Sequence, residues 1–207
     1  MRIGIVGGTF NPIHVAHLVT AECFTSQMKL DICYFVPAYQ SPFKDAVSVV
    51  SPEHRSEMVN IAISDNPKFV LLEYEIQRAG VSYTIDTITE LQRMHSDADL
   101  FLLTGTDHAV MFTQWKDWTE ICLRSQLCIV RRPLAESTVN EQMLTAQLTV
   151  QNRAPIWISA PLMSVSSTEI RTMIAQHQSI RYLVPDRVRE FIAAHRLYQE
   201  MLRPAGA

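Results

Sequence analysis

The sequence lacks the features that mark secreted, membrane-spanning and disulfide-bonded proteins. It has only four cysteines, Cys23, Cys33, Cys122 and Cys128, and no Cys-x-x-Cys pair. A chain of 207 residues buries a full core without disulfides, so we expect reduced, mostly buried thiols. No apolar run approaches the roughly 20 residues of a membrane helix, and no basic and apolar leader precedes the first expected strand. We therefore expect a cytoplasmic protein with no membrane partner.

An excess of basic residues is also missing. The chain has 18 Lys and Arg against 21 Asp and Glu, a net charge of -3, which argues against a nucleic-acid partner but leaves room for a local anion pocket. The hydrophobic content of 47% with 19% charged residues is typical of a globular protein and excludes disordered and fibrous classes. We expect one domain over residues 1–207, with a helical C-terminal part at about 166–200.

Two common phosphate-binding loops are absent, since the sequence has neither Gly-x-Gly-x-x-Gly nor Gly-x-x-x-x-Gly-Lys-Ser/Thr in its first turn. Instead, Gly7 and Gly8 separate an apolar run at 3–6 from an amphipathic stretch at about 13–27. Glycines allow positive φ and carry no Cβ, so a phosphate could approach the backbone at the start of the following helix. This order predicts a break in the strand at the glycines and an anion site beside it.

A histidine pair, His14 and His17, lies at the start of the same expected helix. Residues three apart share a helix face, so both imidazoles could donate hydrogen bonds to a phosphate. Such a pair alone is more often a helix start or a chance surface pair, and the glycine turn is what favours the anion site. Because the His-Glu-x-x-His pattern is missing, we do not predict a protein-bound metal.

Apolar runs and amphipathic stretches alternate along the whole chain. Strands are expected at 3–6, 32–36, 69–72, 100–103 and 127–130, and helices at about 13–27, from 52, from 84, from 166 and over 185–198. The polar stretch at 134–153 is expected to be a loose surface helix or loop. Alternation of this kind predicts the α/β class, a doubly wound and mainly parallel sheet with helices on both faces. Ligands then bind beyond the strand ends where the strand order switches direction.

A second anion-binding pattern lies near the C-terminus. Ser166 and Glu169 fit a capping box and predict a helix N-terminus. The hydroxyls of Ser167 and Thr168, the free amides of the first turn and the Arg171 guanidinium would together clamp an anion. Such a pattern alone more often marks only a capped helix. The N-terminal motif in the same chain is what favours a second anion site here.

Both patterns match known signatures. They are Gly7-Gly8-Thr9-Phe10-Asn11-Pro12-Ile13-His14-x-x-His17 and Ser166-Ser167-Thr168-x-Ile170-Arg171; further matches are Ser82-Tyr83-Thr84-x-Asp86-Thr87, Gly105-x-Asp107, Phe112 with Trp115, and Arg131-Arg132-Pro133. The chain thus resembles the Rossmann-like nucleotidyltransferase superfamily with the HxGH and SSTxIR signatures. Within it, the chain is similar to the nicotinate-nucleotide adenylyltransferase family over nearly its whole length. Ala16 departs from the usual glycine between the histidines, and Phe43 replaces a frequent histidine.

The resemblance implies an enzyme of NAD biosynthesis with ATP and nicotinate mononucleotide as its partners. AMP would pass from ATP to the mononucleotide, giving nicotinate adenine dinucleotide and pyrophosphate without a covalent enzyme intermediate. His14, His17 and Arg171 are the implied catalytic residues, which position the reactants and stabilise charge. Mg2+ would arrive on the ATP phosphates, with no protein metal site.

The resemblance also implies a set of binding residues. Those for ATP are Gly8, Thr9, Phe10, His14, His17, Gly105, Asp107, Arg132, Ser167, Thr168 and Arg171; those for the mononucleotide are Lys44, Tyr83, Thr84 and Trp115. Asp107 would accept hydrogen bonds from the ribose, and Trp115 would stack on the pyridine ring. A loop-capping aspartate and a half-buried core tryptophan are the structural alternatives.

Three other functions are weighed against these motifs. A sister adenylyltransferase would use nicotinamide mononucleotide or phosphopantetheine as its acceptor. A catalytically silent nucleotide-binding regulator is suggested by Ala16, and it would bind ATP without releasing pyrophosphate. A scaffold protein would leave the paired anion sites unexplained.

Overall fold

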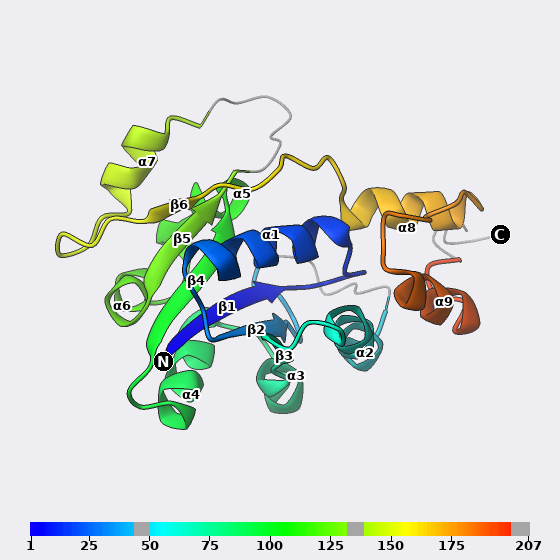
Figure 1. The fold of residues 1–207 in the computed structure, drawn as a ribbon, viewed down its shortest axis with the longest axis horizontal. Helices are drawn as coiled ribbons and strands as arrows, with labels where there is room; N and C mark the ends of the chain where they lie inside the picture. The colour runs from blue at the N-terminus through cyan, green and yellow to red at the C-terminus, as the bar shows by residue number, and fades with distance from the viewer. Residues whose placement is uncertain (44–49, 132–138, 200–207) are drawn as a thin grey trace.

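The computed structural model describes residues 1–43, 50–131 and 139–199, in which the strands form one parallel sheet (Figure 1). The six strands of this described part have the order β3-β2-β1-β4-β5-β6. They are β1 (Arg2–Gly8), β2 (Ile32–Pro37), β3 (Phe69–Leu71), β4 (Asp99–Gly105), β5 (Gln126–Val130) and β6 (Ile156–Ile158). The order reverses direction between β1 and β4, as in other doubly wound sheets. The expected α/β class is confirmed.

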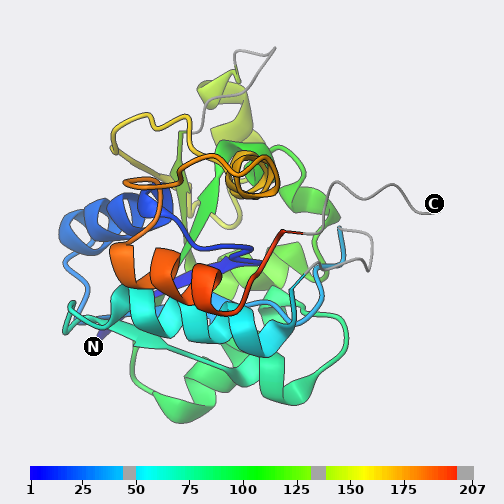
Figure 2. The ribbon, with the colours of Figure 1, turned by 90° about the vertical axis from the view of Figure 1, so that its right-hand side faces the viewer.

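Helices cover both faces of the sheet (Figures 1 and 2). They are α1 (Val15–Gln27), α2 (Pro52–Ile63), α3 (Tyr74–Arg78), α4 (Thr84–Met94), α5 (Thr106–Ala109), the 3-10 turn η1 (Phe112–Gln114), α6 (Trp118–Arg124), α7 (Glu141–Gln147), α8 (Ser167–Ala175) and α9 (Asp186–Ala194). Apolar residues of α1, α2, α8 and α9 share one core cluster, and those of α4, α6 and α7 share another. The helices α8 and α9 extend the first cluster beyond the carboxyl end of β1.

The strand β1 shows why the sequence pattern produces two cores. Ile3 and Ile5 belong to the cluster under α4, whereas Val6 belongs to the cluster under α1, because alternate residues point to opposite faces. Gly4 faces α1 as well, and a Cβ there would lie 2.5 Å from Leu30 Cδ1 and 2.8 Å from Phe24 Cε1. Glycine at this position therefore lets α1 and the turn after it approach the sheet closely.

The glycines after this run differ from the prediction. The strand continues through Gly7 and Gly8, which pair with Val36 and Pro37 of β2, and neither has a positive φ. The ladder with β2 holds these glycines extended, so the chain turns later, at Phe10, whose φ is 47°. A Cβ at Gly7 would meet no atom within 4 Å. The expected strand break at the glycines is wrong. Gly7 has an ordinary extended backbone, and the space beside its Cα is open.

The C-terminal helix is shorter than predicted. The helix α9 ends at Ala194, and the chain then turns through Arg196 and Tyr198, which have φ values of 52° and 67°. The turns bring Tyr198 into the core, where only 3% of it is exposed. The elements α3, α5, η1, α6 and β6 were not predicted, because each is too short to show a periodicity. The polar stretch at 134–153 is expected to be a loose surface helix or loop, and it contains the short helix α7.

No helix within the described ranges is long and apolar enough to cross a membrane. The expected state of the cysteines is confirmed, since all four are free thiols and Cys33, Cys122 and Cys128 are buried. Burial raises the pKa of Cys33 and of Cys128 to about 12 and that of Cys122 to about 11. These thiols are therefore almost entirely protonated at neutral pH.

A thiol titration of the native protein tests this burial. At pH 8, the half-buried Cys23 should react with an aromatic disulfide reagent in the first minutes, while the three buried thiols should stay unreactive because thiolate is the nucleophile. The same titration in guanidinium chloride should count all four. Rapid reaction of more than one thiol in the native state would contradict the described packing.

The pair Gly4 and Gly7 provides a matched test of packing. Replacing Gly4 by alanine should lower the free energy of unfolding by about 1–3 kcal/mol, because the new methyl overlaps Leu30 and Phe24. The same change at Gly7 should alter it by no more than about 0.5 kcal/mol. Urea denaturation measures both values, and equal losses would rule out the close approach of α1 as the cause.

Candidate functional site

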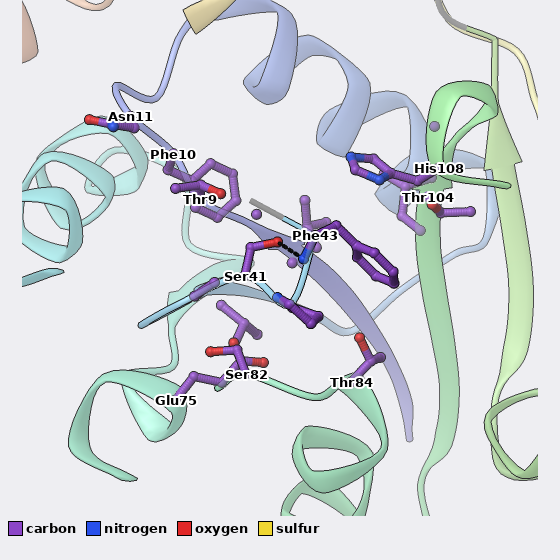
Figure 3. A pocket seen from close by; sticks show the side chains of 18 of the residues that line it. Thr9, Phe10, Asn11, Ser41, Phe43, Glu75, Ser82, Thr84, Thr104 and His108 are labelled. Carbon is purple, nitrogen blue, oxygen red and sulfur yellow. Dashed lines mark hydrogen bonds between the residues drawn. The ribbon is translucent and has the colours of Figure 1, made fainter. Parts of the chain in front are cut away.

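A pocket of about 1110 Å³ opens at the carboxyl ends of β1, β2 and β4, where the strand order switches direction. Figure 3 shows its walls: Thr9, Phe10 and Asn11 after β1; Ser41 and Phe43 after β2; Glu75 in α3; Ser82 and Thr84 at the start of α4; and Thr104 and His108 at the end of β4 and on α5. The first residues of α8 close the remaining side. The pocket therefore lies at the edge of the sheet where a ligand is expected to bind in a doubly wound fold.

All predicted site residues that the structure describes lie around this pocket. They are Gly8, Thr9, Phe10, His14, His17, Tyr83, Thr84, Gly105, Asp107, Trp115, Ser167, Thr168 and Arg171. Lys44 and Arg132 lie outside the described residues. Phe43 also lines the pocket, whereas Ala16 is absent from its lining. The methyl group of Ala16 therefore does not border the described pocket.

The two histidines form a stacked pair at the start of α1. Their ring centroids are 3.7 Å apart, and the planes are inclined by 27°. His14 precedes the first helical residue, and its backbone N–H donates to Nδ1 of His17 at 3.2 Å. An Nδ1 that accepts a hydrogen bond leaves the ring proton on Nε2. His17 therefore presents a donor, and its ring packs against Phe10 in a T-shaped arrangement with the centroids 5.1 Å apart.

The two anion motifs are joined to each other although they lie far apart in the sequence. Ser166 caps α8 by accepting from the Glu169 N–H at 3.1 Å, as the capping box predicted. Ser167 Oγ then donates to the carbonyl of Pro12 at 2.9 Å, and Arg171 Nη1 donates to that of Asn11 at 2.8 Å. These bonds hold the start of α8 against the turn that follows β1.

Arg55 is a residue of this site that the sequence analysis missed. It is fully buried, and its guanidinium donates to the carbonyls of Thr9 and Ala38, each at 2.7 Å, and of Tyr39 at 3.0 Å. Burial lowers the pKa of Arg55 from its ordinary high value. Its spacing from the apolar residues Met58, Val59 and Ala62 could have revealed that it points inward.

Glu75 is a second missed residue and lines the pocket opposite the β1 turn. It accepts a hydrogen bond from Thr87 Oγ1 at 2.5 Å, and burial raises its pKa, an effect opposed by hydrogen bonds from Thr87 and Ser82. Ser82 in turn accepts from the Tyr39 N–H at 3.0 Å and donates its own N–H to the carbonyl of Gln40 at 2.9 Å. This network ties the start of α4 to the segment after β2.

The predicted aromatic wall is formed by Trp115, which follows η1. Its ring packs against Phe112, with the centroids 4.8 Å apart, and faces Phe43 at 6.3 Å. Its Nε1 is buried and has no hydrogen-bond partner within the described residues. Asp107 lies in α5 rather than in a loop, with an oxygen 3.9 Å from Nε2 of His108.

Comparison with known proteins shows the family to which the chain belongs. The cytidylyltransferase-like family model matches residues 5–173 of the chain. A probable nicotinate-nucleotide adenylyltransferase from Salinibacter ruber is 36% identical over 199 residues, which cover 96% of this chain and 98% of the relative. A protein of the same description from a Thermoanaerobacter species is 35% identical over 201 residues, which cover 97% of this chain and 95% of the relative. The chain belongs to the nicotinate-nucleotide adenylyltransferase family. The expected resemblance is confirmed.

Solved structures show that the fold of this family extends to distant members. Plasmodium falciparum nicotinic acid mononucleotide adenylyltransferase complexed with NaAD has a TM-score of 0.77 and 18% identity, covering 98% of this chain and 99% of that one. The same enzyme complexed with APC has a TM-score of 0.76 at the same identity. At this identity, the comparison establishes the shared fold.

The contact between Tyr198 and the β1 turn can be tested by removing one oxygen. The hydroxyl of the buried Tyr198 donates to Asn11 Oδ1 at 2.8 Å. Replacement by phenylalanine should lower the free energy of unfolding by about 1–2 kcal/mol, because the hydrogen bond of a buried hydroxyl to the partly buried Asn11 is lost. Tyr182, which is 81% exposed, gives the matched control and should show no change on the same substitution. Equal melting temperatures of the two variants would contradict the contact.

Proposed function

We propose that this pocket binds ATP and nicotinate mononucleotide together and transfers AMP between them, with pyrophosphate as the second product. The observation that supports this most directly is the convergence of two anion motifs. Ser167 and Arg171 of α8 donate hydrogen bonds to the turn that leads into the stacked histidines, and the starts of α1 and α8 border the same pocket. The names of the relatives point to the same reaction.

The ATP phosphates belong at the α1 and α8 side of the pocket in this proposal. Free amides at the start of α8, together with Ser167, Thr168 and Arg171, bind the β and γ phosphates. His17 Nε2 and His14 donate to oxygens of the α phosphate. Gly8, Thr9 and Phe10 form the adjacent backbone wall, Asp107 and Gly105 hold the ribose, and Arg132 adds a charge from outside the described residues.

The mononucleotide belongs on the opposite side, next to α4 and Trp115. The Trp115 ring stacks on the pyridine ring, and Phe43 stands across from it at the 6.3 Å centroid separation given above. The Thr84 hydroxyl and the backbone amides after Tyr83 bind the ring carboxylate, because the start of α4 leaves amides without a backbone acceptor. Lys44, outside the described residues, is proposed to contact the mononucleotide phosphate.

The chemical step needs alignment more than proton transfer. An anionic oxygen of the mononucleotide phosphate attacks the α phosphorus of ATP in line, the bond from that phosphorus to the bridging oxygen breaks, and pyrophosphate leaves. No group on the protein has to remove a proton. The fixed donors of His17 and Arg171 stabilise the negative charge that collects on the α phosphoryl and leaving oxygens.

Magnesium fits this site as a companion of ATP. Within the described residues, no three His, Cys, Asp or Glu side chains are placed to hold a metal ion, and the ion is proposed to be held by phosphate oxygens and water. When bound, it neutralises phosphate charge. The free thiols support the proposed cytoplasmic location, and the cluster shared by the sheet with α8 and α9 supports a single domain over residues 1–207.

The proposal is tested by pyrophosphate release from ATP and magnesium. We expect release with nicotinate mononucleotide and much less with nicotinamide mononucleotide or phosphopantetheine. His17→Ala should lower kcat about 100-fold or more, since one fixed donor to a developing charge is removed. His195→Ala, at the exposed end of α9 and outside the pocket lining, should keep wild-type activity.

Other outcomes would replace the proposal. ATP binding without pyrophosphate release from any acceptor would favour the silent regulator, and release with phosphopantetheine alone would favour the sister enzyme. A His17→Ala variant as active as the wild type would remove the histidine pair from the reaction.

A further inference from the structure

We propose that Lys116 determines the preference of this pocket for an acidic mononucleotide over its amide. This inference rests on the proposed function, and it assigns to Lys116 a role in substrate specificity. Lys116 follows Trp115 in the chain and lines the same pocket. It thus stands next to the ring that is proposed to stack on the pyridine.

The ammonium of Lys116 lies at the start of α4. Its Nζ is 4.6 Å from the centroid of the Tyr83 ring and 3.9 Å from Oδ1 of Asp86. Tyr83 is the residue before α4, and Asp86 lies in its first turn. The cation therefore occupies the corner in which the free amides of α4 meet the pocket.

The charges of this corner leave a surplus positive charge. Asp86 faces two cations, Arg78 Nη2 at 3.6 Å and Lys116 Nζ at 3.9 Å. Glu75, a further carboxyl group close to Asp86, is buried, and its raised pKa means that it holds its proton more readily than an exposed glutamate. Asp117, the neighbour of Lys116 in the chain, is exposed and is not part of the pocket lining. The positive end of the α4 dipole has the same sign as the surplus. A carboxylate entering this corner gains an attraction that a neutral carboxamide does not.

Lys116 is better placed than Arg78 to supply this charge to a ligand. Arg78 already donates to the carbonyl of Val81 and is not part of the pocket lining. The separation of Lys116 from Asp86 exceeds a direct hydrogen bond, so the ammonium can donate to a ligand while Arg78 continues to neutralise Asp86. About half of the Lys116 side chain is exposed, at 48%, which permits this movement.

The experiment compares two acceptors in one pair of lysine variants. Lys116→Met should lower kcat/KM for nicotinate mononucleotide by about tenfold or more, the effect of losing one charge-assisted hydrogen bond. With nicotinamide mononucleotide, kcat/KM should change less than about threefold, because the amide makes no ionic contact. KM for ATP should stay the same. Lys116→Arg should retain most of the acid preference.

Lys29→Met is the matched control, since Lys29 is exposed after α1 and does not line the pocket. This variant should keep the wild-type kcat/KM for both mononucleotides. Its melting temperature should equal that of Lys116→Met. Equal losses with the acid and the amide in Lys116→Met, or an unchanged preference, would overturn the inference while leaving the proposed function intact. A wild-type protein that releases no pyrophosphate with either mononucleotide would instead refute the proposed function, and this inference with it.

Discussion

The buried guanidinium of Arg55 is the interaction on which the pocket most depends. A single side chain from α2 bonds to the carbonyl of Thr9 after β1 and to the carbonyls of Ala38 and Tyr39 after β2. Loops beyond neighbouring parallel strands have few backbone partners of their own, because the ladder ends with the strands. Arg55 supplies the missing donors, and its desolvation is tolerable because hydrogen bonds to a charged group are worth about 1.5–3 kcal/mol each. Its position thereby fixes where the turn carrying the histidines can lie.

The remaining walls are attached to that turn from distant parts of the chain. Ser167 and Arg171 bring α8 to the carbonyls of Pro12 and Asn11, and Tyr198 reaches the side chain of Asn11. On the other side, the network of Glu75 and Ser82 attaches the start of α4 to the segment after β2. Residues that bind a ligand in this proposal are thus held by side chains and carbonyls that do not touch it. A rigid arrangement of donors of this kind is what a transfer reaction with little acid or base chemistry requires.

Much of the site could be predicted from local patterns. The α/β class followed from alternating apolar runs, and the start of α8 followed from the spacing of Ser166 and Glu169, because both depend on interactions within a few residues. The glycines were interpreted wrongly in one respect. Their type suggested a break in the strand, but pairing with β2 keeps Gly7 and Gly8 extended and moves the turn to Phe10. Tertiary pairing overrode a local preference there.

The sequence by itself determined the two anion motifs and the aromatic residue of the site. It also determined the parallel sheet, whose strand order reverses where these residues meet. Only the tertiary structure revealed the side chains that hold the pocket walls in place, which are Arg55, Glu75 and Tyr198. It also placed Lys116 next to Tyr83 and Asp86. The physical reason is that motifs express short-range periodicity and capping, which are encoded in neighbouring residues. Contacts such as that of Arg171 with Asn11, 160 residues apart, arise only when the folded sheet brings loop ends together.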